Sequence, residues 1–303
     1  MSYDMYLYGM ILRTNSFLLE GDYPEADTYA EIRKKYSLPG GETGTCATVL
    51  LGLGRSVKMD GTFMGKSTMP FIKKFYEGAP CDLSSLHLDE TFDGLEDNVL
   101  VAGNTRTPFG EFRKFYSDPV HRWNAPKAED IAGAKVAGID PYFREDSVRA
   151  AEMCREMGKP YVTIDCAYDS PMHRLSAVNI VSNEFYREHY KQEERDQVLQ
   201  KYMDASDGLT IFTLGAKEIR FGRKGGKIRS FEPYQVDVVS TLGAGDPFRA
   251  VCIYALWAGL DDLSPVRFAP PCAPVASTRF QLPLNPPQLA EVLMLMSTRG
   301  NVL

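Results

Sequence analysis

The alternation of strand-like and helical segments between residues 134 and 214 constrains the fold of this chain more than any other feature. Four short apolar runs there have the pattern of strands: 134–139, 161–164, 178–181 and 209–214. Residues 145–157 repeat apolar side chains at helical spacing, and this pattern ends at Gly158 and Pro160. Strands that alternate with helices predict a parallel sheet with crossover helices, in which ligands bind at the carboxyl ends of the strands.

The rest of the chain is consistent with one domain of this class. Further strand patterns lie at 5–12, 57–63 and 99–103, and a glycine pair precedes a helical pattern over 42–53. The chain has 303 residues, of which 44% are hydrophobic and 24% charged, as in ordinary globular proteins. We therefore interpret residues 1–303 as a single α/β domain.

Charge and cysteine usage exclude several classes of function. The net charge is −6, and no run of basic residues is longer than Arg33-Lys34-Lys35, so we expect no nucleic-acid partner. The first residues lack a secretory signal and no segment has 18 uninterrupted apolar residues, so we expect a cytoplasmic protein without a membrane partner. Six scattered cysteines without a Cys-x-x-Cys pair signal neither a disulfide framework nor a structural zinc site.

Two polar, turn-rich segments depart from the α/β alternation. They cover about 13–39 and 86–107. The first is too long for a simple connection, and the second contains short strand-like pieces and turn residues. The sequence is compatible with two interpretations. Either the segments form one small β-sheet that acts as a lid or an oligomer contact, or they are two ordinary surface loops.

Three glycine-rich segments are candidates for phosphate binding. Gly52-Leu-Gly54 follows a helical pattern and is typical of a helix C-terminus, not of a dinucleotide fingerprint. Gly61 to Ser67 resembles a Walker A loop with one residue too few, so we interpret it as a turn that leads into a helix from Ser67. Without a complete dinucleotide fingerprint, a nicotinamide-dependent oxidoreductase is also excluded.

The third segment, from Ser240 to Asp246, fits an anion site. Gly243 and Gly245 allow a sharp turn, Pro247 suits the first turn of the apolar helix that follows, and the N–H groups before it are free for an anion. Asp246 adds a carboxylate that can accept a proton from an attacking hydroxyl. On local sequence alone, the favoured interpretation of Asp246 is the N-cap of that helix.

This segment resembles the Asp-Thr-x-Gly-Ala-Gly-Asp signature of the ribokinase-like (PfkB) carbohydrate kinase family. Further pieces follow in the family's order along nearly the whole chain. They are Gly40-Gly41, Asn104-Thr-Arg106-Thr107, Val181-Ser-Asn183-Glu184 and Thr213-Leu-Gly215-Ala-Lys217. Several matches in the right order carry more weight than one match alone.

The resemblance implies a ribokinase-like fold with a β-lid, ATP and Mg²⁺ as cofactors, and phosphorylation of a sugar or a sugar-like small molecule. It implies residues for catalysis, nucleotide binding, metal binding and acceptor binding, and a homodimer formed through the lid. Catalysis would use Asp246 as the base with Gly243, Ala244 and Gly245 as the anion hole; Asn183, Thr213 and Gly215 would border the nucleotide and Glu184 the metal; Asn15, Gly40, Gly41 and Arg106 would bind the acceptor. A monovalent cation near the anion hole is a further possibility in this family.

The chain also departs from the family pattern. The aspartate expected shortly after the first strand is absent, Thr14-Asn15 lies in its place, and Thr45 stands where an asparagine is expected. Ser240 replaces the first aspartate of the signature, and prolines interrupt 268–287, where the family has a helix beside the adenine. These departures support an alternative function, a family member that binds its ligand without turnover and acts as a sensor or structural partner.

Overall fold

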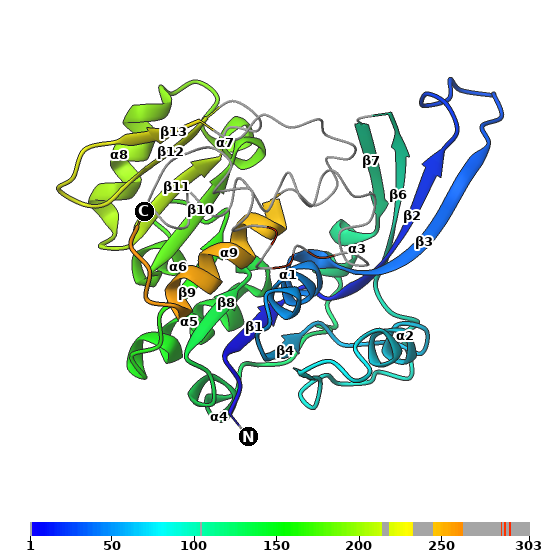
Figure 1. Ribbon diagram of the computed structural model, residues 1–303, viewed down its shortest axis with the longest axis horizontal. Helices are drawn as coiled ribbons and strands as arrows, with labels where there is room; N and C mark the ends of the chain where they lie inside the picture. Colours follow the sequence, from blue (N-terminus) through cyan, green and yellow to red (C-terminus); the bar gives the residue numbers. More distant parts are fainter. Residues whose placement is uncertain are drawn as a thin grey trace.

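The computed structural model describes residues 2–103, 105–213, 218–232 and 245–262, together with 286, 288 and 291. Within these residues, a large sheet has the strand order β13-β12-β11-β10-β9-β8-β1-β4-β5 (Figure 1). Neighbouring strands from β11 to β5 run parallel, whereas β12 and β13 are antiparallel. The strands are β1 (Met5–Gly9), β4 (Val57–Gly61), β5 (Cys81–Asp82), β8 (Val136–Ile139), β9 (Tyr161–Ile164), β10 (Val178–Ser182), β11 (Leu209–Thr213), β12 (Ile219–Gly222) and β13 (Arg229–Phe231).

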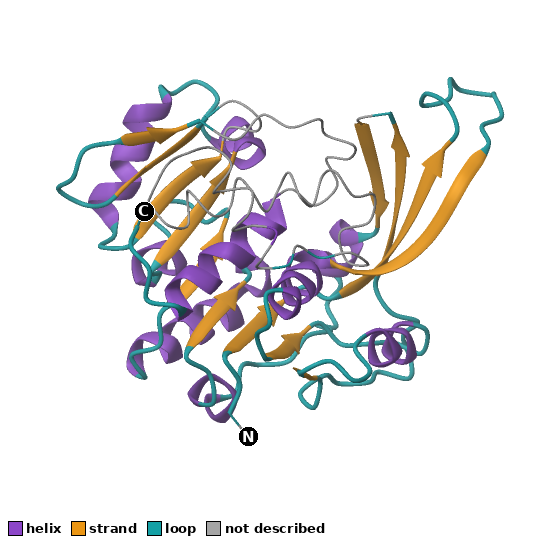
Figure 2. Ribbon diagram, viewed as in Figure 1, coloured by secondary structure: helices purple, strands orange, loops and turns teal. Residues whose placement is uncertain are grey.

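Helices cover both faces of this sheet (Figure 2). The helices are α1 (Gly41–Gly52), α2 (Thr68–Phe75), α3 (Phe112–Ser117), α4 (Ala128–Ala132), α5 (Arg144–Glu156), α6 (Pro171–Leu175), α7 (Asn183–His189), α8 (Arg195–Ala205) and α9 (Gly245–Trp257), with a 3₁₀ turn over Pro141–Phe143. Among the residues described here, no helix has both the length and the apolar character that crossing a membrane requires.

The central strand β1 is buried on both faces because its side chains alternate between two cores. Met5 and Leu7 belong to the core formed with α1, α2 and α9. Tyr6 and Tyr8 belong to the opposite core, which contains residues of α4, α5 and α6. The result is the three-layer α/β architecture that the alternation between residues 134 and 214 predicts.

A second, smaller sheet stands beside the large one (Figure 1). Its order is β3-β2-β6-β7, from β2 (Leu12–Leu19), β3 (Ile32–Gly40), β6 (Glu96–Ala102) and β7 (Thr105–Gly110). The two polar segments meet where β2 and β6 pair in parallel, with Arg13 opposite Glu96 and Leu18 opposite Val101. This pairing confirms the predicted small β-sheet and rules out two separate loops.

The predicted first strand, 5–12, is in fact two strands. The chain leaves the large sheet after Gly9 and enters the small sheet at Leu12. The cause is the carboxylate of Asp140, which fills the space beside Gly9: a Cβ there would lie 1.9 Å from Asp140 Oδ2. The Met10 N–H donates to the same oxygen at 2.7 Å. A buried carboxylate therefore sets the point at which the chain passes from one sheet to the other.

Other predicted boundaries shift by a few residues. The strand predicted over 57–63 ends at Gly61, whose φ of +131° and close approach to the Gly9 carbonyl suit only glycine. The strand predicted over 99–103 begins three residues earlier, at Glu96. Gly52 ends α1 and Gly54 follows with a φ of +76°, as expected for a helix C-terminus.

Asp140 and Arg249 form an ion pair at the centre of the molecule. Their side chains are 0% and 1% exposed. Burial disfavours the guanidinium charge, but Asp140 beside it holds the pKa of Arg249 above its ordinary value. Thr43 Oγ1 donates to Asp140 Oδ2 at 3.2 Å. The pair thereby joins the end of β8, helix α9, the first turn of α1 and the passage between the two sheets.

We predict that removing either member of this pair destabilises the fold strongly. Arg249→Met leaves a buried carboxylate without its counter-ion, and Asp140→Asn leaves a buried guanidinium, each at a cost of about 3–5 kcal/mol. The double variant should cost less than the sum of the two, because no uncompensated charge remains. Urea denaturation of the four proteins measures this, and unchanged midpoints in the single variants would contradict it.

Candidate functional site

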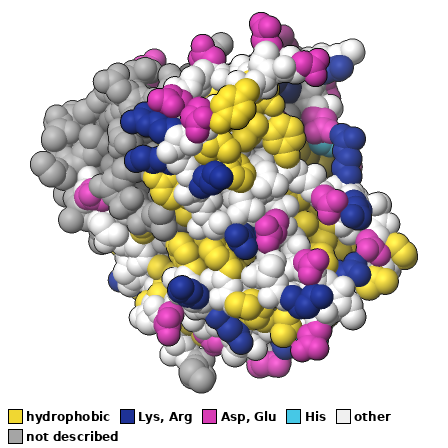
Figure 3. Space-filling view, turned by 90° about the vertical axis from the view of Figure 1, so that its right-hand side faces the viewer, with side chains coloured by type: hydrophobic (Ala, Val, Ile, Leu, Met, Phe, Trp, Pro, Cys, Tyr) yellow, Lys and Arg dark blue, Asp and Glu magenta, His cyan; other side chains and the backbone are white. Residues whose placement is uncertain are grey.

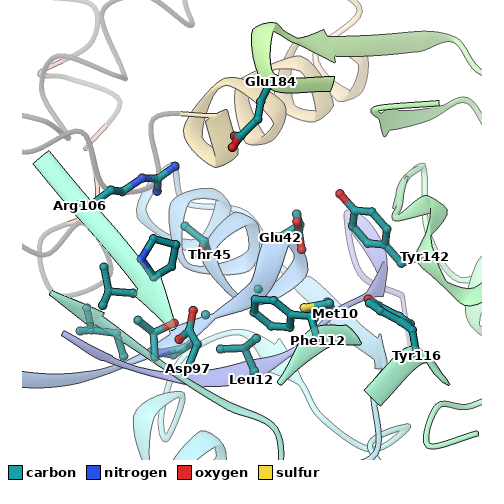
Figure 4. A pocket seen from close by; sticks show the side chains of 17 residues that line it. Met10, Leu12, Glu42, Thr45, Asp97, Arg106, Phe112, Tyr116, Tyr142 and Glu184 are labelled. Atoms are coloured by element: carbon teal, nitrogen blue, oxygen red, sulfur yellow. The ribbon is translucent and has the colours of Figure 1, made fainter. Parts of the chain in front are cut away.

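A cavity of about 480 Å³ lies between the small sheet and the first turn of α1 (Figure 4). Helix α3, the 3₁₀ turn and Glu184 of α7 close its other sides. The lining residues are Met10, Leu12, Thr14, Leu38, Pro39, Gly40, Gly41, Glu42, Thr45, Asp97, Val99, Arg106, Pro108, Phe112, Tyr116, Tyr142 and Glu184. Polar groups from the small sheet and α1 face an aromatic side formed by Phe112, Tyr116 and Tyr142 (Figure 4).

The glycine pair brings the start of α1 against Met10, where the chain passes from the large sheet to the small one. Gly41 has a φ of +71°, and a Cβ on it would lie 2.4 Å from the Met10 carbonyl oxygen. A Cβ on Gly40 would lie 1.9 Å from Thr14 Oγ1. The helix therefore starts at the cavity because neither position has a side chain, and both predicted glycines line it.

The structure does not bring Asn15 to this cavity. Successive side chains of a strand point to opposite faces, so Thr14 faces the cavity and Asn15 faces away from it. The Asn15 amide donates to Glu96 at 3.0 Å and its carbonyl oxygen accepts from Ser37 at 2.8 Å. The amide of Asn15 is thus satisfied within the small sheet, and its neighbour Thr14 is the residue of this pair that lines the cavity.

Asp97 and Arg106 enter the cavity from the small sheet (Figure 4). Asp97 lies on β6 directly opposite Thr14 in the ladder, and Arg106 lies on β7 opposite Val101. Asp97 is only 9% exposed, and this burial raises its pKa to about 6, against the opposing effects of a hydrogen bond from Thr14 and of the Arg106 charge. The cavity therefore holds a buried carboxylate and a predicted acceptor-binding cation on one wall.

The predicted nucleotide residues Asn183 and Thr213 lie at one edge of the large sheet. Thr213 ends β11 and pairs with Ser182, the last residue of the neighbouring strand β10, and Asn183 follows Ser182 as the first residue of α7. The side-chain oxygen Oδ1 of Asn183 accepts a hydrogen bond from Arg195 at 3.1 Å, and the Arg195 guanidinium lies 5.1 Å from the centre of the Tyr186 ring. Tyr186 is thus a packing surface for Arg195.

Glu184, the predicted metal ligand, follows Asn183 and lines the cavity (Figure 4). In the part of the chain that the structure describes, no three His, Cys, Asp or Glu side chains come together in a way that could hold a metal ion. Mg²⁺ usually keeps several water ligands and takes only one or two carboxylates from a protein. A single carboxylate at this place is compatible with such a site.

Helix α9 begins at Gly245 with Pro247 in its first turn, as the glycine motif predicts. One turn further along, Arg249 pairs with Asp140, which also binds Met10 and Thr43, so the start of α9 lies beside the start of α1. Gly215, Gly243, Ala244, the Asp246 side chain and most of 268–287 lie outside the described residues.

Sequence reasoning missed Asp97, Asp140 and Arg249. Asp140 directly follows a predicted strand, at the edge where ligands of parallel sheets bind, and this position is a usable signal. Arg249 is the one charge in the apolar run from Phe248 to Trp257, which is typical of a buried ionic partner. Asp97 carries no signal of its own, because its burial depends on its pairing with Thr14.

Solved structures of similar fold cover almost the whole chain. A candidate ribokinase from Agrobacterium tumefaciens matches with a TM-score of 0.84 and 17% identity, over 99% of both chains. The ribokinase of Arabidopsis thaliana, solved with ribose and ATP, matches at 0.78 and 15%, over 98% of this chain and 99% of that one. A nucleoside kinase from Burkholderia thailandensis, solved with inosine, matches at 0.74 and 16%, over 97% and 98%. The fold is therefore ribokinase-like.

The sequence itself identifies the family. A comparison with the sequences of curated proteins gives no match. The model of the pfkB family carbohydrate kinases, however, matches residues 104–286, which is more than half of the 303 residues and includes the Gly-Ala-Gly-Asp segment. This confirms the resemblance seen in the motifs. The chain therefore belongs to the pfkB family of carbohydrate kinases.

Proposed function

We propose that the protein transfers the γ-phosphoryl group of ATP to a hydroxyl of a sugar or a sugar-like small molecule. The observation that carries this proposal is the cavity between the small sheet and the glycine start of α1, with the start of α9 beside it. Family membership supports the reaction class. The Arabidopsis relative was solved with ribose and ATP, and the Burkholderia relative with inosine, which supports an acceptor of this kind.

Asp246 would act as the base of this reaction. Its carboxylate would accept the proton of the acceptor hydroxyl while the hydroxyl oxygen attacks the γ-phosphorus and the bond to ADP breaks. The backbone N–H groups of Gly243, Ala244 and Gly245 would stabilise the charge that develops on the phosphoryl oxygens, as donors at a helix N-terminus do.

Asn183, Thr213 and Gly215 would border the nucleotide, since Thr213 ends β11 and Asn183 directly follows the neighbouring strand β10 at the carboxyl edge of the sheet. Glu184 would hold Mg²⁺ through its water shell, and the ion would reduce the repulsion between the phosphates and the attacking oxygen.

The acceptor would lie in the cavity, with Gly40, Gly41 and Arg106 on its polar side. The aromatic side, Phe112, Tyr116 and Tyr142, offers a surface for an apolar or ring-shaped part of the acceptor. A panel of sugars, nucleosides and sugar acids, followed by ADP release with Mg-ATP, tests the proposal. If no compound of the panel causes ADP release, the kinase function is contradicted.

A sensor without turnover is the second candidate. It is favoured by Thr14 and Thr45, which line the cavity where the family pattern has an aspartate and an asparagine. Binding of Mg-ATP and of a panel member without ADP release would support it over the kinase.

We predict that Asp246→Asn abolishes most of the turnover with little effect on folding. Asparagine keeps the shape and caps a helix about as well as aspartate, so the midpoint of unfolding should hardly change. Loss of the base should lower kcat about 10²- to 10⁴-fold while ATP still binds. Parent-like turnover in this variant would reduce Asp246 to a helix cap.

We predict that Arg106→Ala weakens acceptor binding selectively. The side chain lines the cavity on the acceptor side, so its loss should raise the acceptor KM by about tenfold, as for one charged hydrogen bond, and leave the KM for ATP unchanged. Lys35→Ala is the matched control, because Lys35 is an exposed cation of the same sheet and does not line the cavity. Equal effects of both changes would assign Arg106 to the surface.

We predict a homodimer formed through the small sheet. Strands β3 and β7 form the edges of this sheet, and Phe109 of β7 is 48% exposed. Figure 3 looks onto the side of the molecule where β2 and β3 lie, and hydrophobic side chains gather there among charged ones. Sedimentation velocity at micromolar concentration should give a dimer, and Phe109→Asp should shift it toward monomer. A monomeric parent protein would contradict the prediction.

A further inference from the structure

The burial of the Asp97 carboxylate in the small sheet costs free energy of folding. Its side chain is almost enclosed, and among the described residues no group donates a hydrogen bond to its Oδ1 atom. Thr14 is its direct partner in the ladder, and the Thr14 hydroxyl lowers the pKa of the Asp97 carboxyl. A buried carboxylate oxygen without a donor destabilises a fold, so its presence at a cavity calls for a ligand that supplies the donor.

The position of Asp97 relative to Thr14 suggests what that ligand is. In the ladder between β2 and β6 the two residues are direct partners, and both line the cavity. Thr14 and Asn15 lie where the family pattern has an acidic residue, and neither of them has a carboxylate. Asp97 brings a carboxylate to the same wall of the cavity from the neighbouring strand.

The surroundings of Asp97 allow a neutral, hydroxyl-bearing ligand. Among the described lining residues, Arg106 is the cation, and Glu42 and Glu184 are acidic groups besides Asp97 (Figure 4). In this part of the lining, three carboxylates face one guanidinium, which disfavours an acceptor that carries a negative charge. Hydroxyl groups, by contrast, donate to carboxylates in strong, charge-assisted hydrogen bonds.

We propose that Asp97 binds a hydroxyl of the phosphoryl acceptor and is the specificity-determining residue of this site, with a neutral polyhydroxyl compound as its ligand. This proposal rests on the proposed function, because the acceptor is the molecule that the kinase would phosphorylate. The ionised Asp97 carboxylate accepts a hydrogen bond from this hydroxyl, and no proton is transferred. Thr14, the partner of Asp97 in the ladder, fixes the orientation of the carboxylate. Sugar acids, which carry a carboxylate of their own, bind more weakly than neutral sugars.

Three variants test the role of Asp97 with the panel member that the parent protein binds best. Asp97→Asn keeps the shape and removes the charge, and should raise the acceptor KM or Kd about 10- to 100-fold with an unchanged KM for ATP. Asn98→Ala, an exposed neighbour on the same strand, is the control and should have no effect. The double variant Thr14→Asp with Asp97→Thr moves the carboxylate to the facing strand and should restore most of the binding.

Two further measurements separate binding from a structural role. Because the pKa of Asp97 is about 6, acceptor binding by the parent protein should weaken as the pH falls below 6, and that by Asp97→Asn should not. The folded state favours protonated Asp97, so the parent loses this stabilisation as the pH rises through 6. Asp97→Asn should therefore melt at the same or a higher temperature than the parent at pH 7.5, and this advantage should shrink toward pH 4.

The outcomes distinguish this proposal from the proposed function. If the parent protein turns over and Asp97→Asn has the same acceptor KM as the parent, the role of Asp97 is overturned and the kinase function stands. Acceptor binding that is lost in Asp97→Asn, without turnover in the parent, would support Asp97 and contradict the kinase. Preference for sugar acids over neutral sugars would overturn the specificity, and a parent protein that neither binds nor phosphorylates any panel member would contradict both proposals.

Discussion

The ion pair between Asp140 and Arg249 is the interaction on which the rest of the structure depends. It lies where three parts of the molecule meet: the large sheet, the first turn of α1 and helix α9. The Asp140 carboxylate also accepts a hydrogen bond from the Met10 N–H and fixes the point at which the chain leaves the large sheet. Since buried ions are stable only with their partners in place, the pair holds these parts in one arrangement. The cavity is defined by that arrangement.

The residues around the cavity divide into two groups with different support. The glycines at the start of α1 are held by the passage between the sheets and by the core beneath them. Thr14, Asp97 and Arg106 belong to the small sheet, whose strands pair with one another and not with the large sheet. A site formed between the large sheet's helices and a separate sheet suits a reaction from which water must be excluded once the substrates are bound.

The sequence predicted the elements well and the side chains that face the cavity poorly. The strand at 161–164 and the glycine start of α1 were predictable because apolar periodicity and glycine placement are local signals. The choice between Thr14 and Asn15 was not, because a strand shifted by one residue exchanges its two faces. Asp140 and Arg249 lie 109 positions apart, and only the tertiary structure shows that they neutralise each other.

The parallel pairing of β2 and β6 has a consequence for the order of folding. Asn15 and Glu96, which hydrogen-bond across this pairing, are 81 positions apart in the chain. The intervening chain includes α1, β4 and α2, which pack into the core of the large sheet. Contacts of such separation carry a large loop-closure cost until the chain between them is ordered. The small sheet is therefore expected to assemble on a core that already exists, and the wall of the cavity that this sheet forms is among the last parts of the protein to form.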